Sequence, residues 1–166
     1  MTAPTENWAR AYARQAQSDL RVREILVVAR AERCHQLHFL QMAAEKACKA
    51  HLSAANGNRD VKRTHAYVAK ILPILAKAFY SSLNGQTSLT EWQSVRIRRL
   101  AEEIELLAPS CNADEVRNDN SEYPWLDGQG VVQIPCEYKF GNIDDQDKAM
   151  VLTIRLLRAA AAAYAA

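Results

Sequence analysis

The stretch from Gln41 to Leu72, QMAAEKACKAHLSAANGNRDVKRTHAYVAKIL, decides the fold. Its first part has apolar residues at helical spacing and predicts a helix over about 36–55. Small residues at 43, 44, 47 and 50 would let a neighbouring helix approach closely. Asn56-Gly57 ends this helix, because Asn and Gly tolerate the left-handed conformation at a helix C-terminus. A polar loop follows, and a third helix opens near Thr64, a plausible N-cap.

The same spacing predicts three further helices outside this stretch. The first starts at Thr5 or Asn7 and ends before a turn in 30–36. The third helix of the chain continues from Thr64 to Asn84-Gly85 and contains Pro73. The fourth opens with the capping-box spacing Ser88-x-x-Glu91, buries Trp92, and ends at Pro109. The last begins near Asp144 or Asp145, since carboxylates suit a helix N-terminus.

Between the last two helices lies an insert, 110–142, that Pro and Gly break repeatedly. We expect at most a short hairpin there, with Val131–Ile134 paired to Glu137–Phe140. From Pro109 to Asp147 nine acidic residues face two basic ones, a net of −7, so the rest of this +2 chain carries +9. A basic body permits nucleic-acid binding without proving it. Tyr123-Pro124-Trp125 could stack on a base, but we favour aromatics that pin the insert to the bundle.

The expected fold class is therefore all-α: one domain over 1–166, a five-helix, mostly antiparallel bundle with a long irregular acidic insert before the last helix. No apolar run reaches the ~20 residues that cross a bilayer. The N-terminus lacks the basic and apolar blocks of a secretory signal. We expect a cytoplasmic protein with no membrane partner.

Arg59-Asp60-x4-His65 is the first candidate for chemistry. Cleavage of RNA needs a group that moves a proton at the 2′-hydroxyl or the leaving oxygen, and His titrates near neutral pH. It also needs a cation against the charge on the phosphate, which Arg supplies with bidentate geometry. Lys62 and Arg63 add to the local positive field. Spacing alone favours a plainer interpretation, in which His65 packs at the helix start and Arg59 is a solvated loop residue.

Three other clusters have plain interpretations. Cys34, His35 and His38 could face one metal ion, but no further ligand has a recognised spacing, so we expect no metal, no cofactor and free thiols. Glu45 and Lys49 have the spacing of a solvated i,i+4 ion pair. Arg96, Arg98 and Arg99 have the spacing of a solvated helix face.

Four motifs resemble the HEPN domain family (higher eukaryotes and prokaryotes nucleotide-binding). Trp8 through Ala16-Gln-Ser-Asp19-Leu20 resembles the family's first-helix pattern. The run 41–50, QMAAEKACKA, resembles its second-helix signature and is the most specific element. Thr64-His65 resembles the pair that opens the third helix, and Tyr123-Pro124 the pair ahead of the last helix.

This resemblance implies an α-helical bundle that often forms a two-fold dimer. Many members are metal-independent RNases with an R-x4–6-H motif, and Arg59, Asp60 and His65 fit it. The expected function is a HEPN-like metal-independent endoribonuclease, of toxin or defence type. It would be a homodimer in which two motifs act on one RNA phosphate and leave a cyclic phosphate. The alternative is a non-catalytic module that binds a nucleotide, an RNA or a protein, such as a nucleotidyltransferase antitoxin.

Overall fold

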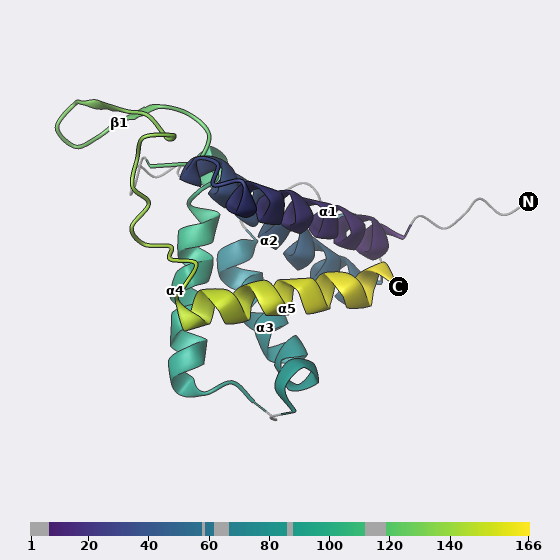
Figure 1. The fold of residues 1–166 in the computed structure, drawn as a ribbon. Coiled ribbons are helices and arrows are strands. Elements are labelled where there is room, and N and C mark those ends of the chain that lie inside the picture. The colour runs from purple at the N-terminus through teal and green to yellow at the C-terminus, as the bar shows by residue number, and fades with distance from the viewer. Residues whose placement is uncertain (1–6, 58, 62–66, 86–87, 112–118) are drawn as a thin grey trace, which may run out of the picture.

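A computed structural model describes residues 7–57, 59–61, 67–85, 88–111 and 119–166. These residues form a mostly helical bundle with one small two-stranded sheet (Figure 1). The elements in chain order are α1 (Trp8–Val28), α2 (Arg33–Ala55), α3 (Val68–Asn84), α4 (Glu91–Glu105), the 3-10 turn η1 (Pro109–Cys111), β1 (Trp125–Leu126), β2 (Val132–Gln133) and α5 (Lys148–Ala165). Within the described residues, no helix has the length and apolar character that would let it cross a membrane.

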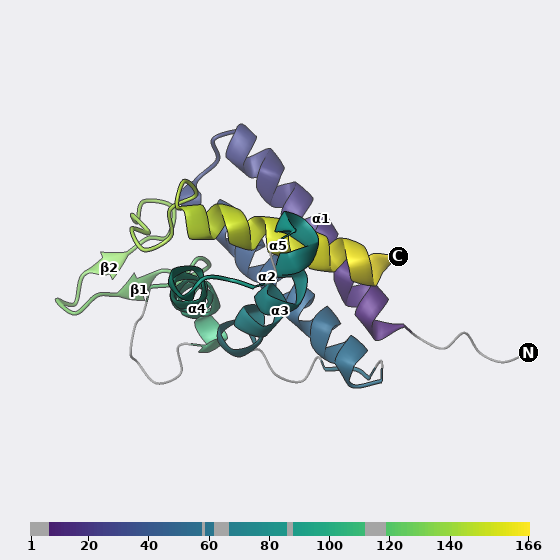
Figure 2. The ribbon, with the colours of Figure 1, turned by 90° about the horizontal axis from the view of Figure 1, so that it is seen from below.

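Helices α2 and α5 are the centre of the bundle, since each contacts all four other helices. Figure 2 shows α1 and α2 side by side in opposite directions, joined by a tight turn. The small residues of α2 are fully buried, as expected for a helix that neighbours approach closely. The core combines them with long aliphatic side chains from α2, α3, α4 and α5: Leu37, Leu40, Ala43, Ala44, Ala47, Leu72, Leu75, Ile104 and Leu157.

Several helix ends match the sequence. Asn7 caps α1 by accepting a hydrogen bond from the Arg10 amide, at 2.9 Å. Gly85 ends α3 in the left-handed conformation, with φ of 64°. Pro73 lies inside α3. The expected Thr64 cap lies outside the described residues, and the described α3 begins at Val68.

Other helix ends were predicted wrongly by a few residues. Helix α2 begins at Arg33, three residues earlier than expected, and the Gln36 side-chain nitrogen donates to the Ala31 carbonyl of the preceding turn at 2.7 Å. Thr90, and not Ser88, caps α4: its hydroxyl accepts from the Gln93 amide while the Gln93 side chain accepts from the Thr90 amide. Asp147, and not Asp144 or Asp145, caps α5 by accepting from the Ala149 amide at 2.7 Å.

The expected burial of Trp92 is also wrong. Its side chain is 54% exposed, although it sits in the first turn of α4. The buried face of α4 starts one turn later, at Ile97, and continues through Leu100 and Ile104. Trp92 instead borders a groove described below.

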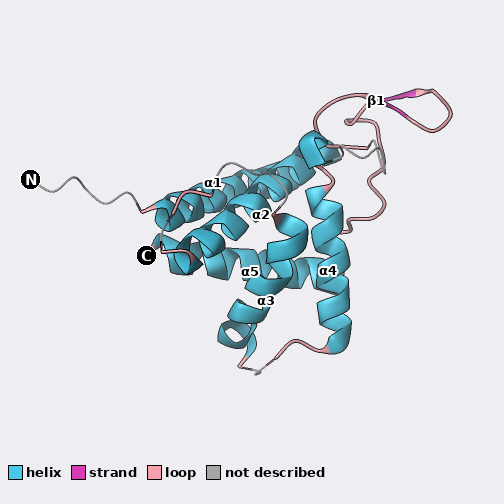
Figure 3. Cartoon of the chain, turned by 180° about the vertical axis from the view of Figure 1, so that it is seen from behind, coloured by secondary structure: helices cyan, strands magenta, loops and turns pink. Residues whose placement is uncertain are grey.

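The hairpin in the insert pairs differently from the prediction. Strand β2 pairs antiparallel with β1, which precedes it, in the register Trp125↔Gln133 and Leu126↔Val132. It does not pair with 137–140, because the chain turns directly after Ile134: the Tyr138 amide donates to the Ile134 carbonyl at 3.0 Å. The hairpin extends away from the helices beyond the C-terminal end of α4 (Figure 3).

Aromatic side chains pin the base of this hairpin to the bundle, as the favoured interpretation of Trp125 expects. Trp125 meets Tyr138 edge-on at 4.9 Å between ring centroids, and Tyr138 meets Phe140 at 5.0 Å. Phe140 is buried in the main core. Tyr123, in contrast, is exposed.

Asp127 holds the hairpin turn through its carboxylate. Hydrogen bonds from the Val131 and Gln129 amides, each 2.9 Å long, lower the pKa of its carboxyl below the ordinary 3.8. A lowered carboxyl pKa stabilises the turn above the ordinary pKa, and this support is lost as the pH falls through the folded-state value. We expect amide-exchange protection of Val131 to be full at neutral pH and to disappear in acid. Asp127→Asn should weaken this pH dependence, and equal acid sensitivity in both proteins would contradict it.

Candidate functional site

A polar stripe crosses the buried face of α2. Gln41, Glu45, Lys49 and Ser53 recur at intervals of four residues and therefore lie along one side of the helix. The Gln41 amide nitrogen donates to one Glu45 oxygen at 3.1 Å, and the Lys49 Nζ lies 2.6 Å from the other. The predicted solvated pair is thus wrong: Glu45 is only 9% exposed and Lys49 only 5%.

Two tyrosines enclose the Lys49 ammonium. Its Nζ lies 5.9 Å from the ring centroid of Tyr12 and 5.8 Å from that of Tyr67. A cation over an aromatic face is attracted by the ring quadrupole, more strongly where water is excluded. Glu45, Tyr12 and Tyr67 therefore compensate the charge of Lys49 from several sides.

The same residues hold the start of the candidate loop. The Ser53 hydroxyl donates to the Arg59 carbonyl at 2.8 Å, and the Tyr67 hydroxyl donates to the Val61 carbonyl at 2.9 Å. The Tyr12 hydroxyl donates to the Asp60 carboxylate at 2.9 Å. Burial, and then this bond to Asp60, raise the pKa of Tyr12, so its hydroxyl stays a donor at neutral pH. Three side chains thus fix the backbone and the carboxylate of 59–61.

Of the predicted catalytic residues, the structure describes Arg59 and Asp60. Both are exposed and adjacent, at the surface above the polar stripe. The Arg59 guanidinium has no ion-pair partner within the described part of the chain. Lys62, Arg63 and His65 lie outside the described residues, so the meeting of Arg59 with His65 stays a prediction.

Residues of the first-helix and second-helix motifs contact each other. The Lys46 Nζ lies 2.6 Å from an Asp19 oxygen, and Gln15 donates to the other oxygen at 3.1 Å. Asp19 is buried, so this pair joins α1 to α2 where the solvent contributes little screening. The sequence indicates no site role for Tyr12 or Asp19, because a four-residue spacing does not reveal which loop a helix face lies under.

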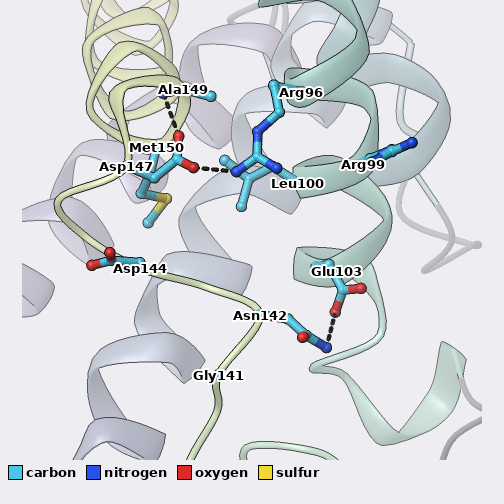
Figure 4. Close-up of a pocket in the computed structure, with 10 residues that line it drawn as sticks. All are labelled: Arg96, Arg99, Leu100, Glu103, Gly141, Asn142, Asp144, Asp147, Ala149 and Met150. Atoms are coloured by element: carbon cyan, nitrogen blue, oxygen red, sulfur yellow. Dashed lines mark hydrogen bonds and ion pairs between the residues drawn. The ribbon is translucent and has the colours of Figure 1, made fainter.

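A polar pocket of about 340 Å³ lies away from this stripe, between α4 and the segment that leads into α5 (Figure 4). Arg96 pairs with Asp147 there, and Asn142 donates to Glu103 at 3.3 Å. The predicted solvated face is confirmed for Arg98 and Arg99, which are exposed, whereas Arg96 is half-buried and paired with Asp147, with 42% of its side chain still exposed. Because Arg96 and Arg99 are outnumbered by Glu103, Asp144 and Asp147, the lining disfavours a phosphate group.

The cysteine and histidine cluster is dispersed. Cys34 is buried and His35 is exposed, while the His38 Nδ1 lies 3.5 Å from Glu122 across a poor hydrogen-bond geometry. Among the residues that the structure describes, no group of three or more metal-ligating side chains is placed to hold an ion. The described cysteines are free thiols.

No family model, curated protein or solved structure matches this chain. The likeness to the HEPN family therefore rests on the four sequence motifs. The structure shows three contacts among the residues in and near these motifs, whatever the family. Asp19 pairs with Lys46, Glu45 pairs with Lys49, and Ser53 of the α2 stripe bonds to the segment that begins with Arg59.

Proposed function

We propose that this protein is a HEPN-like endoribonuclease that cleaves RNA without a metal ion, through the loop from Arg59 to His65. The observation that carries this proposal is the anchoring of 59–61 over the polar stripe of α2. Three hydrogen bonds fix the segment while leaving the Arg59 side chain exposed. An exposed guanidinium on an anchored backbone is suited to binding phosphate, because it can contact two phosphate oxygens at once while the backbone needs no further ordering.

In this proposal each residue has one role. His65 moves the proton as the 2′-oxygen forms a bond to phosphorus and the bond to the 5′-oxygen breaks, leaving a cyclic phosphate. Arg59 stabilises the charge that develops on the phosphate oxygens. Asp60, held by the Tyr12 hydroxyl, orients the cation or the imidazole, and Lys62 and Arg63 attract the RNA backbone. A homodimer that brings two such loops to one phosphate completes the proposed site.

The test is cleavage of a panel of RNAs in the presence of EDTA, resolved on denaturing gels. We expect the wild type to cut and His65→Ala to lose at least about a hundredfold in rate, the lower range for a general acid or base. Arg59→Lys should also be slow, because an ammonium does not reproduce the bidentate contact. Arg98→Ala, an exposed arginine on α4, is the matched control and should retain the wild-type rate.

Equal cleavage by the wild type and His65→Ala would disprove the assignment. Binding of RNA without cleavage by any variant would instead support the non-catalytic binding module. Mass spectrometry of the products tests the proposed chemistry, since this reaction leaves a cyclic phosphate at the 3′ end of the upstream fragment and a 5′-hydroxyl on the downstream fragment. The comparison of the wild type with His65→Ala, purified in the same way, separates it from a contaminant.

A further inference from the structure

The hairpin of the insert carries apolar side chains that its own chain leaves uncovered. Residues 121–138, here called the hairpin arm, include the exposed side chains of Leu126 and Val132 on the two strands and of Val131 and Ile134 beside them. A lone two-stranded hairpin is only marginally stable in water. Apolar side chains gathered on a projecting element are typical of a surface that another molecule covers.

All charged residues of the arm are acidic. Its 18 residues contain Glu122, Asp127 and Glu137 and no Lys, Arg or His. An occupant of the arm surface should therefore combine apolar side chains with positive charge.

The same chain offers such a surface elsewhere. A groove of about 540 Å³ lies where α3, α4 and α5 meet, and we call it the α3–α5 groove. Buried Tyr80 and Leu152 line it together with the exposed apolar parts of Trp92 and Val151. Its only charged lining residues in the described chain are Lys148 and Arg155. Gln93 and Gln146 complete the lining, so the groove combines apolar and neutral polar side chains with two positive charges and is complementary to the apolar, acidic arm.

The arm cannot reach the groove of its own molecule. Trp92 lies in the first turn of α4, and the arm extends beyond the last turn of that helix (Figures 1 and 3). A helix of 15 residues is about 22 Å long, so the two surfaces lie at opposite ends of it. Contact between them requires two molecules.

We propose that the hairpin arm of one copy docks into the α3–α5 groove of a second copy. If each copy gives its arm to the other, the contact forms twice around a two-fold axis and closes a dimer. The volume of the groove falls in the range of pockets that enclose several apolar groups, about 300–1,000 Å³. This interface does not depend on the proposed RNA cleavage, since none of its residues belongs to the candidate site.

Sedimentation and mixing experiments test this pairing. We expect the wild type to dimerise at micromolar concentration, and Val132→Asp in the arm or Val151→Asp in the groove to weaken the dimer at least roughly tenfold. Both residues are exposed, Val132 at 61% and Val151 at 46%, so neither change should unfold the bundle. Trp92→Ala is a second groove variant, and circular dichroism checks the fold of each protein.

Mixing the two aspartate variants is the decisive measurement. A mixed pair retains one intact contact, between the arm of the groove variant and the groove of the arm variant. We therefore expect fluorescence anisotropy to show the labelled arm variant binding the groove variant at least roughly tenfold more tightly than either variant binds itself. Val28→Asp, at an 84% exposed apolar position on α1, is the matched control and should dimerise as the wild type does.

Three results would overturn the proposal: a monomeric wild type, a dimer that survives both aspartate variants, or no gain in affinity on mixing. No gain on mixing would indicate that the same surface of each copy pairs with itself, rather than the arm with the groove. Because the assays measure mass and affinity alone, an inactive but dimeric protein leaves this interface standing. A monomer that cleaves RNA would overturn this interface and the homodimeric form of the proposed site, while leaving the roles of Arg59 and His65 in cleavage standing.

Discussion

Lys49→Met is expected to lower the free energy of unfolding by about 3–5 kcal/mol, because it leaves the Glu45 carboxylate buried without its cation. Gln41 still donates one hydrogen bond to Glu45, which offsets only part of that desolvation. The substitution also removes the ammonium from between Tyr12 and Tyr67. Equilibrium unfolding in urea, followed by circular dichroism, measures the change.

Two control variants separate charge from packing in this prediction. Glu45→Gln combined with Lys49→Met removes both charges and should recover most of the loss, since neutral replacements of buried ion pairs are often well tolerated. Arg158→Met breaks an exposed ion pair with Glu24 and should change stability by less than about 1 kcal/mol. If Lys49→Met costs no more than Arg158→Met, then the pair contributes as a surface pair does.

Asp145→Ala is expected to lower the free energy of unfolding by about 2–4 kcal/mol. This is slightly less than for Lys49→Met, because Asp145 is partly exposed. The carboxylate lies 2.5 Å from the Arg23 guanidinium and 2.7 Å from that of Arg33, so it ties α1 and α2 to the segment before α5. Arg23 is buried, and its burial lowers the pKa of the guanidinium against the attraction of Asp145. Without Asp145 that charge would be buried beside Arg33, with its Nε still lacking a hydrogen-bond partner.

The neighbouring Asp144 is the matched control for this second prediction. It is exposed and accepts a hydrogen bond from the Gln146 amide, so Asp144→Ala should cost about 1 kcal/mol or less. The same urea denaturation compares the two. An equal loss for both substitutions would mean that the ion pairs of Asp145 contribute little beyond a local turn.

The helices were predictable because their signals are local. Apolar residues at intervals of three and four, with Asn7 before the first helix and Gly85 after the third, depend only on neighbours along the chain. The errors arose where two local signals competed. Ser88-x-x-Glu91 and Thr90-x-x-Gln93 both have capping-box spacing, and the sequence does not say which pair closes its hydrogen bonds.

The hairpin shows a different limit. The expected strand in Val131–Ile134 is confirmed, but it pairs with the preceding strand β1 and not with the following segment 137–140. Pro135 follows Ile134 directly, and the chain turns there, whereas Asp127 closes the preceding turn with its own carboxylate. That closure depends on side-chain geometry rather than on the pattern of apolar residues.

Some features of the candidate site were predictable from sequence and others were not. The order of amino acids is enough to predict the helices, the place of Arg59 and Asp60 in a polar loop, and the motifs that resemble a known family. The burial of Glu45 and Lys49 becomes visible only in the folded chain, because polar residues at intervals of four have the same pattern on a solvated face and on a covered one. What covers them, Tyr12, Tyr67 and the segment 59–61, comes from parts of the chain that lie far apart in sequence or beyond a loop. Burial is a property of those contacts, and no local pattern encodes them.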